Sequence, residues 1–312
     1  MKIVSLLPSA TEIVCALGLE DSLVGVTHEC DHPVGISSKP HLTASRISHE
    51  TMTSAEIDHA VRSQLDGHGT IYDLDTELLA ELGPDLIITQ ELCDVCAVSY
   101  EIVKKAAKSY VADATVVSLE PNTIEDIFDN IRYVAELCGV ADRGDRLVSD
   151  LQKRLDEVTN KTSRLGKKRV FMLEWLEPPF SPGHWVPQQV EIAGGISLLG
   201  EVGKKSVTTS YEAIAESDPD TMVMIPCGYY AADILRQLPQ TVFPESWKSI
   251  RAVFDDNIWA LDATSYFSRP GPRVVDGAEI LAKILHPEVF GEPSANEAVR
   301  ISKDSLRFEQ QS

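Results

Sequence analysis

The sequence predicts an α/β protein built from two lobes that a helical segment joins. Seven short apolar runs of the β-strand type recur along the chain, and stretches with helical periodicity separate them. A strand-free stretch from residue 123 to about residue 165 divides these runs into a group of four and a group of three. Nearly continuous apolar strands joined by helices are typical of parallel sheets that helices cover on both faces.

The four runs of the first group predict a parallel sheet in the N-terminal lobe. The strands are expected at residues 2–7, 22–26, 85–90 and 114–119. Helices are expected between them at residues 11–19, 75–82 and 100–110. The second group predicts a similar sheet in the C-terminal lobe, with strands at residues 169–175, 221–226 and 257–262.

The strand-free middle of the chain predicts two helices that break near Gly139. Apolar residues repeat there at helical spacing: Ile124, Ile127, Ile131 and Val134, and then Leu147, Leu151, Leu155 and Val158. A helix of about 20 residues spans about 30 Å, which is long enough to connect two small domains. We therefore expect an N-terminal lobe at 1–122, a helical linker at 123–166, a C-terminal lobe at 167–288 and a polar tail at 289–312.

Composition excludes several classes of partner and location. The 28 Lys and Arg against 48 Asp and Glu give a net charge of −20, which disfavours binding to nucleic acid or to an anionic membrane. No apolar run is long enough for membrane insertion. Six scattered cysteines argue against a disulfide framework. A strand pattern begins one residue after Met1 and leaves no room for a signal peptide, so we expect a cytoplasmic protein, or a periplasmic one only if a signal has been removed.

The loops that follow the expected strands carry the candidate ligand-binding residues. Open parallel sheets bind ligands at the carboxyl ends of their strands, and aromatic and polar side chains gather in these loops. Flat aromatic side chains suit a large planar ligand, since each offers much apolar area with little rotamer entropy to lose. The candidates are Ser9, which could also cap the first helix, Tyr72, Trp175, Phe180, Trp185, Tyr229, Tyr266, Phe267 and Arg269.

Cysteines and histidines after two of the strands suggest a metal site. "THECDHP" supplies His28, Cys30 and His32, and "ELCDVC" supplies Cys93 and Cys96 as a C-x-x-C pair. This spacing lets both thiolates reach one zinc or iron ion, and Cys30 with a histidine could complete four ligands. Three interpretations stay open for these thiols: ordinary buried or loop cysteines, ligands of a metal ion or of cobalt, and a reversible disulfide.

Several segments resemble the substrate-binding proteins for cobalamin and iron chelates that serve ABC importers. The likeness runs from residue 2 to about residue 285, and its most specific parts are "KIVSLLPSATEIVCALGLEDSLVGVTHECDHP", the "PPF" loop and "SYFSRPGPR". The resemblance implies a class III substrate-binding protein, also called a helical-backbone metal receptor. Such a protein has two Rossmann-like lobes, one backbone helix, and a ligand between the lobes with little hinge motion.

The resemblance also implies roles for individual residues. In the cobalamin-binding branch, Phe180 matches an aromatic of the "PPF" loop, and Tyr266, Phe267 and Arg269 match an aromatic pair with its following arginine, all in contact with the corrin ring and its amides. Glu101 and Glu212 approximately match two acidic residues that dock into the permease.

These observations favour a non-enzymatic protein that binds a corrinoid, such as cobalamin, or a related metal tetrapyrrole, as a carrier, sensor or transport-related receptor. One alternative is a metal ion or iron chelate held by the same thiols and imidazoles. Another is an enzyme that uses Cys30 or Cys93 as a nucleophile or metal-activated thiol.

Overall fold

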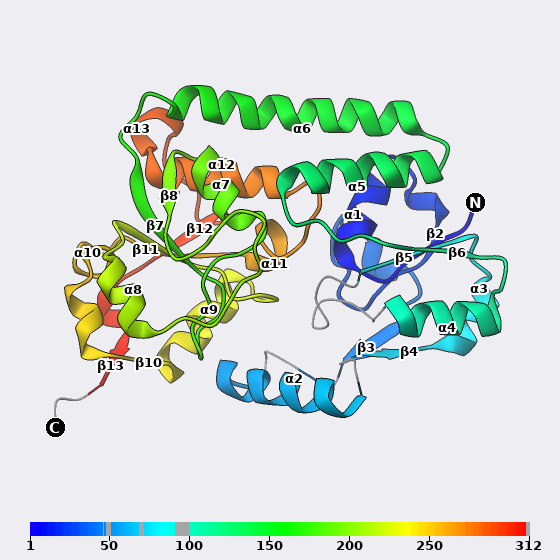
Figure 1. Cartoon of the computed structure of the whole chain (residues 1–312), viewed down its shortest axis with the longest axis horizontal. Helices are drawn as coiled ribbons and strands as arrows, with labels where there is room; N and C mark the ends of the chain where they lie inside the picture. The colour runs from blue at the N-terminus through cyan, green and yellow to red at the C-terminus, as the bar shows by residue number, and fades with distance from the viewer. Residues whose placement is uncertain (46, 48–50, 69–71, 91–99, 310–312) are drawn as a thin grey trace. The chain divides into compact units, whose positions relative to one another are not determined.

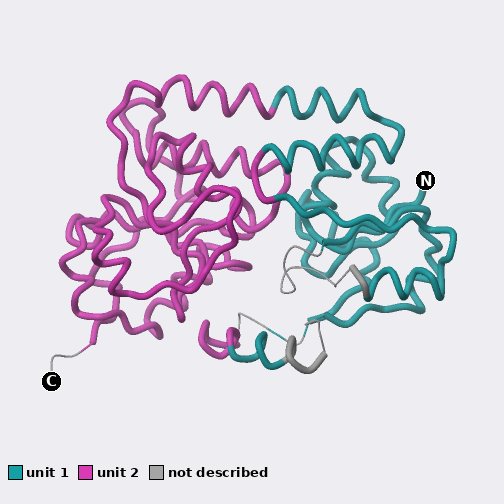
Figure 2. The backbone as a smooth tube through the Cα atoms, in the orientation of Figure 1, with its two compact units in different colours: residues 1–48, 59–121, 125–150 teal, residues 49–58, 122–124, 151–312 magenta. Residues whose placement is uncertain are grey.

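The computed structural model describes residues 1–45, 47, 51–68, 72–90 and 100–309, and these form two compact units (Figure 2). Unit 1 comprises residues 1–48, 59–121 and 125–150, and unit 2 comprises residues 49–58, 122–124 and 151–312. The domain boundaries expected from the sequence stay a prediction. Within each unit, the observed strands and helices can be compared directly with those expected from the sequence.

Unit 1 is built on a four-stranded parallel sheet (Figure 1). Its order is β2 (Leu23–Gly25), β1 (Ile3–Ser5), β5 (Leu86–Thr89) and β6 (Thr115–Ser118). Every residue of β1 and β5 is buried, as expected for central strands that are covered on both faces. All four strands expected in this half of the chain are therefore confirmed.

The helices of unit 1 follow the same alternation: α1 (Pro8–Ala16), α3 (Thr76–Leu82), α4 (Tyr100–Tyr110) and α5 (Ile124–Leu137). The bounds of helix α3 were predictable because local residues mark both of its ends. The Asp75 side chain accepts a hydrogen bond from the backbone N–H of Leu78 at its start, and Gly83 ends it at φ 54°.

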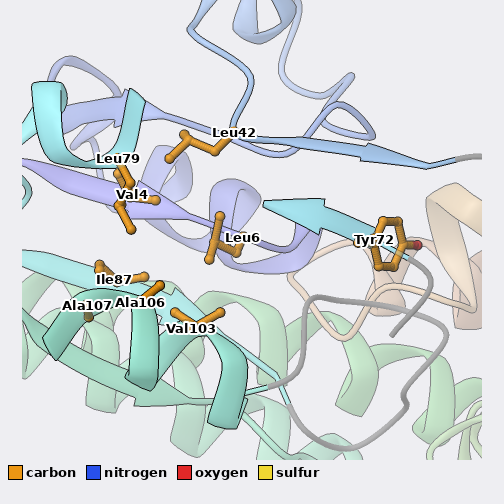
Figure 3. Packing of buried hydrophobic residues seen from close by; sticks show 9 residues of the cluster. All are labelled: Val4, Leu6, Leu42, Tyr72, Leu79, Ile87, Val103, Ala106 and Ala107. Atoms are coloured by element: carbon orange, nitrogen blue, oxygen red, sulfur yellow. The ribbon is translucent and has the colours of Figure 1, made fainter. Parts of the chain in front are cut away.

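A hydrophobic core joins α3 and α4 to the sheet (Figure 3). It contains Val4, Leu6, Leu42, Tyr72, Leu79, Ile87, Val103, Ala106 and Ala107. Tyr72 comes from β4 (Tyr72–Leu74), which pairs antiparallel with β3 (Thr43–Ser45). The sequence did not predict this pair, because neither segment contains the adjacent apolar residues that mark β1 and β5.

Helix α6 (Ala141–Thr162) confirms the long helix expected in the middle of the chain. Gly139 separates it from α5 and adopts a φ of 70°, a left-handed conformation that suits glycine. The N-terminal part of α6 belongs to unit 1, and the part from Leu151 onward belongs to unit 2. In unit 2 the Arg154 guanidinium donates to Glu279 and Asp276 at 2.5 to 2.9 Å, which fixes this end of α6 to α12 (Val274–Leu285).

Unit 2 contains a five-stranded sheet in the order β12 (Ala298–Ile301), β11 (Ile258–Leu261), β9 (Thr221–Met224), β7 (Lys168–Leu173) and β8 (Gly195–Ser197). Strands β7, β9 and β11 confirm the three that were expected. Strand β12 runs antiparallel to β11, and the other pairs are parallel. Since β12 lies within the segment expected to be a polar tail, that segment contributes to the sheet.

Short helices and a second small sheet complete unit 2. The helices are α7 (Val186–Ile192), α8 (Tyr211–Ser217), α9 (Ala231–Gln237), α10 (Arg251–Phe254), α11 (Ala263–Tyr266) and α13 (Pro287–Phe290). Strand β13 (Arg307–Phe308), also from the expected tail, pairs with β10 (Val242–Phe243). Among the described residues, no helix combines the length and the apolar composition that crossing a bilayer needs.

One segment of unit 2 comes from the N-terminal half of the chain. It leads into helix α2 (Ser54–His68), and residues 49–58 belong to unit 2. The Gln237 amide donates to the Met52 carbonyl at 2.8 Å, and the hydroxyls of Ser54 and Tyr229 lie 3.4 Å apart. These hydrogen bonds hold the segment against the residues that follow β9.

Candidate ligand-binding site

Three loops of unit 2 leave the carboxyl ends of neighbouring parallel strands. The loops follow β7, β9 and β11, and backbone hydrogen bonds connect them. Cys227 N–H donates to the Glu174 carbonyl at 3.1 Å, and Thr264 N–H donates to the Tyr229 carbonyl at 3.2 Å. This edge is where an open parallel sheet binds its ligands, so the three loops form the candidate site.

Glu174 braces the loop that follows β7. One of its carboxylate oxygens accepts the Gly183 N–H at 3.0 Å, and the other accepts a short hydrogen bond from the Ser206 hydroxyl. Between these points Phe180 N–H donates to the Trp175 carbonyl at 3.3 Å, which folds the "PPF" segment back on itself. The sequence alone does not reveal this role of Glu174, since its partners are a backbone N–H and a hydroxyl that lie 9 and 32 residues away.

Three of the predicted aromatic residues keep part of their surface exposed: Trp175, Phe180 and Tyr266. The Trp175 ring meets the Tyr229 ring edge-on, with centroids 5.4 Å apart. The indole Nε1 of Trp175 is buried and has no hydrogen-bond partner among the described residues. Burial, with Asp262 nearby, raises the pKa of Tyr266, so its phenol stays protonated at neutral pH.

The other four predicted contacts in unit 2 are buried side chains. Trp185, Tyr229, Phe267 and Arg269 are 5%, 1%, 2% and 8% exposed. The Trp185 indole donates to the Phe267 carbonyl at 2.9 Å, so this pair links α7 to the loop after β11. Little of their surface is exposed, and their role as ligand contacts stays a prediction.

Gln189 is a further support that the sequence analysis missed. It is fully buried in α7, and its amide donates to the carbonyls of Tyr266 at 3.0 Å and Val274 at 2.7 Å. The backbone of α12 comes close here, since a Cβ added at Gly277 would lie 2.8 Å from the Tyr266 carbonyl oxygen. No local sequence signal marks Gln189, because both of its partners are more than 70 residues away.

In unit 1 the loop after β2 places His28 within a group of polar side chains. His28 Nδ1 lies 2.7 Å from the Thr43 hydroxyl, which in turn donates to the Thr27 hydroxyl at 2.8 Å. The Tyr72 ring lies 5.7 Å from the imidazole, and its hydroxyl donates to Glu29 at 2.9 Å. Burial is the main cause that lowers the pKa of His28, which favours a neutral imidazole.

The remaining predicted metal ligands do not gather around His28 in the described part of the chain. Cys30 is 2% exposed, and its sulfur lies 3.1 Å from the Thr11 hydroxyl. His32 is exposed, and Cys93 and Cys96 lie outside the described residues. No group of three or more His, Cys, Asp or Glu in the described residues is placed to hold a metal ion.

Ser9 occupies a different position from the one expected. It is 2% exposed and is the second residue of α1, after Pro8. The cap residue is Leu7, without a side-chain cap, so the prediction that Ser9 caps this helix is wrong. A proline at the first position presets the helical φ and needs no N–H partner, which explains why the helix begins earlier than expected.

The two glutamates matched to permease contacts differ in what the structure describes. Glu212 is exposed and lies in the first turn of α8, after the Ser210 cap. Glu101 lies in the first turn of α4, and its side chain is outside the described residues.

Known proteins with similar sequences and folds are substrate-binding proteins. An uncharacterized ABC transporter substrate-binding lipoprotein of Bacillus subtilis is 24% identical over 296 residues, which cover 93% of this chain and 82% of that relative. A vitamin B12-binding protein of Vibrio cholerae serotype O1 is 24% identical over 288 residues, which cover 91% of this chain and 88% of the relative.

A solved structure shows the same fold. The crystal structure of a periplasmic heme-binding protein from Pseudomonas aeruginosa is 23% identical, has a TM-score of 0.67, and matches 92% of this chain and 93% of its own. This likeness confirms the predicted fold class, with two Rossmann-like lobes joined by a long backbone helix.

The expected cytoplasmic location is wrong. A family model described as periplasmic binding protein matches residues 3–264, the similar solved structure is periplasmic, and the Bacillus relative is a lipoprotein. The prediction relied mainly on the strand pattern at the start of the given sequence, and where a given sequence begins does not determine a compartment. The family match and these relatives confirm the resemblance seen in the sequence, and the chain belongs to the periplasmic binding protein family.

Proposed function

We propose that this protein binds a corrinoid, such as cobalamin, or a related metal tetrapyrrole, and delivers it to an ABC importer. The observation that carries the proposal is the set of partly exposed aromatic rings at the carboxyl edge of the unit 2 sheet. Trp175, Phe180 and Tyr266 offer flat apolar surface on loops that partly buried hydrogen bonds hold in place. A macrocycle with a hydrophobic face gains most from such a surface.

The braces beneath these rings support the same proposal. Glu174 and Gln189 hold the loops through hydrogen bonds to Gly183, Tyr266 and Val274. Loops that are already ordered lose little conformational entropy when a ligand binds, and this favours tight binding. A relative named as a vitamin B12-binding protein aligns over 91% of the chain, which favours a corrinoid among the possible macrocycles.

The proposal is tested by titrating the purified protein with cyanocobalamin and, in parallel, with hemin. The double variant Phe180→Ala, Tyr266→Ala should weaken binding of the preferred macrocycle at least about tenfold, or about 1.4 kcal/mol of binding free energy. Its thermal unfolding without ligand should stay close to that of the wild type, because both side chains are partly exposed.

Phe254→Ala provides the matched control for this experiment. Phe254 is 67% exposed on α10, which precedes β11 and so lies at the opposite edge of the sheet from the candidate site. This variant should bind as the wild type does. Failure of both macrocycles to bind the wild type at tens of micromolar would contradict the proposal, and equal losses in the control would show that the aromatic rings have no specific role.

We also propose that Glu212 contacts the importer. It is an exposed carboxylate in the first turn of α8, and the family supplies the substrate-binding component of ABC importers. With the cognate importer in liposomes, Glu212→Lys should reduce the stimulation of ATPase activity without changing ligand affinity. Glu216→Lys, also exposed and on the same helix, is the control, and an equal effect of both variants would contradict a specific contact.

A further inference from the structure

Two cysteines of unit 1 belong to neighbouring elements that meet at one edge of its sheet. Helix α1 follows β1 and precedes β2, and these two strands pair in parallel. The loop after β2 therefore lies near the first turns of α1, because parallel strands end at the same edge and α1 begins at that edge. Cys15 belongs to α1 and Cys30 to this loop, and both are thiols in the structure.

One contact places Cys30 against the face of α1 that carries Cys15. The Cys30 sulfur lies 3.1 Å from the Thr11 hydroxyl, and the two residues are 2% and 0% exposed. Thr11 and Cys15 are four residues apart in α1, so they are neighbours on one face of the helix. A helical side chain leans toward the preceding turn, which directs the Cys15 sulfur toward Thr11 and hence toward Cys30.

The ionisation of Cys15 responds to the same neighbour. Burial raises the pKa of Cys15 to about 12, and the nearby Glu20 carboxylate and Cys30 thiol add to this rise. The electrostatic effect of Cys30 agrees with its contact to Thr11, one helical turn from Cys15. A raised pKa leaves little thiolate at neutral pH, so thiol–disulfide exchange at Cys15 is slow there and faster in mild alkali.

We propose that Cys15 and Cys30 form an intramolecular disulfide in the folded protein when an organic disulfide, such as oxidised glutathione, supplies the oxidising power. This bond links α1 to the loop after β2 across 30 − 15 = 15 residues of chain. It lies within unit 1 and does not depend on the proposed function. Disulfides form and persist in the periplasm, the compartment after which the family of this chain is named.

The disulfide forms in two balanced exchange steps. The thiolate of Cys15, which is partly exposed, attacks one sulfur of oxidised glutathione, so a mixed disulfide forms and one glutathione thiolate leaves. The thiolate of the buried Cys30 then attacks the Cys15 sulfur and displaces the second glutathione. Two protein thiols are oxidised, one glutathione disulfide is reduced to two thiols, and the two protein protons pass to the released thiolates.

Peptide mapping of the folded wild type identifies the bond. The protein is incubated with oxidised and reduced glutathione at about pH 8 until the product ratio is constant, and remaining thiols are then blocked with N-ethylmaleimide in acid. Protease cleavage after Glu12, Glu20 and Glu29 separates the two cysteines. We expect the main oxidised product to be a cross-linked pair of peptides 13–20 and 30–50, which dithiothreitol separates.

The effect of folding on this bond is measured in two independent ways. The equilibrium constant for disulfide formation should be at least about tenfold larger in the folded protein than in the urea-unfolded chain. By linkage, oxidation then increases the folding equilibrium constant by the same factor, or about 1.4 kcal/mol. The oxidised wild type should therefore unfold at a higher urea concentration than the reduced protein, as measured by circular dichroism.

Variants assign both effects to this pair of thiols. Cys15→Ser should lose the cross-linked peptides and the shift of the urea midpoint on oxidation. Cys138→Ser is the matched control, because Cys138 is another partly exposed cysteine of unit 1, and it should keep both. The mapping uses the wild type, so a variant that does not fold leaves the test decisive.

Several results would overturn the inference. Recovery of Cys15 as a thiol or a glutathione mixed disulfide, without closure to Cys30, would show that the two sulfurs do not meet in the folded protein. A cross-link that forms only in the urea-unfolded chain would show the same. A disulfide between Cys30 and peptide 92–101, which carries Cys93 and Cys96, would make Cys15 the wrong partner. Each of these results leaves the proposal of macrocycle binding unchanged.

Discussion

The two units share one architecture and differ in how they hold the loops at their strand ends. In unit 2, side chains brace the loops by bonding to distant backbone groups, as Glu174 does with Gly183 and Gln189 with Tyr266. In unit 1, the side chains of Thr27, His28 and Thr43 bond mainly to one another. Bonds to backbone fix the shape of a loop, whereas bonds among side chains fix how those side chains lie relative to one another.

This difference predicts that substitutions in the two units have different consequences. Loss of a brace in unit 2 should reduce stability and distort the aromatic surface together. Loss of a hydrogen bond in unit 1 should cost less stability and act mainly on His28. All four tryptophans, including Trp175 and Trp185, belong to unit 2, so tryptophan fluorescence reports on that unit, while far-UV circular dichroism reports on both.

The largest effect is expected at Gly183, where backbone approaches backbone. A Cβ at this position would lie 2.2 Å from the Ser206 nitrogen, a distance that side-chain movement cannot relieve. Gly183→Ala should therefore lower the free energy of unfolding by about 3 kcal/mol, measured by urea denaturation with tryptophan fluorescence. Gly166→Ala is the control, because no atom lies within 4 Å of its added Cβ, and equal stability of the two variants would show that the loop is not tightly braced.

Trp185→Phe should have the next largest effect on stability. It removes the indole N–H that donates to the Phe267 carbonyl at 2.9 Å and leaves a buried acceptor without that donor. We expect the free energy of unfolding to fall by about 2 kcal/mol. Unfolding is monitored by circular dichroism, because the variant lacks one tryptophan fluorophore. A stability equal to that of the wild type, with weaker macrocycle binding, would instead make Trp185 a direct ligand contact.

In unit 1, Thr43→Val should cost less, about 1 kcal/mol. Valine has a similar shape and fills the same space, but it removes the hydroxyl shared by His28 and Thr27. The midpoint of the urea transition measured by circular dichroism should fall, and Thr43→Ser should recover the hydrogen bonds. A loss as large as that of Trp185→Phe would contradict the proposed difference between the units.

The smallest effect concerns the dependence of stability on pH in unit 2. Burial and the nearby Lys205 lower the pKa of His184 from its ordinary value of 6.5, and its Nε2 is buried without a hydrogen-bond partner among the described residues. Below pH 6.5 the unfolded chain therefore binds a proton that the folded protein resists, so stability falls as the pH decreases through this range. The contribution of His184 to stability is fully present above pH 6.5. It is lost as the pH falls toward the lowered pKa of His184 in the folded protein.

The variant His184→Asn should make the fall in stability shallower between about pH 8 and about pH 5. Asparagine tolerates the φ of 51° at this position better than most residues do. Urea denaturation across this range checks the prediction, with His59→Asn as the control because His59 is exposed. An unchanged slope in His184→Asn would show that another group controls the pH dependence.

Patterns that repeat over several residues predicted the fold well. All seven expected strands are present, and the break at Gly139 lies between α5 and α6. These features have local causes, namely apolar side chains at regular spacing and a glycine at a left-handed φ. The strands β3, β4, β8 and β12 were missed, because their formation depends on pairing with a neighbouring strand, which no local pattern reveals.

The candidate site was only partly predictable. The sequence places aromatic residues in the loops that follow the strands, since the residue after a strand is known once the strand is known. It does not show that Trp185, Tyr229, Phe267 and Arg269 are buried while Trp175, Phe180 and Tyr266 keep exposed surface. Burial depends on which distant segments cover a side chain, and no local pattern contains that information.

The sequence by itself determined the alternation of strands and helices, the long helix α6 and the family resemblance, because each depends on residues close together along the chain. Only the tertiary structure decided that Glu174 and Gln189 brace the aromatic loops and that the Thr43 hydroxyl lies within hydrogen-bond distance of His28. Thr43 lies 15 residues from His28, and Gln189 lies 77 residues from Tyr266. Hydrogen bonds over such separations form only after the sheets have brought the loops together, so folding assigns these roles.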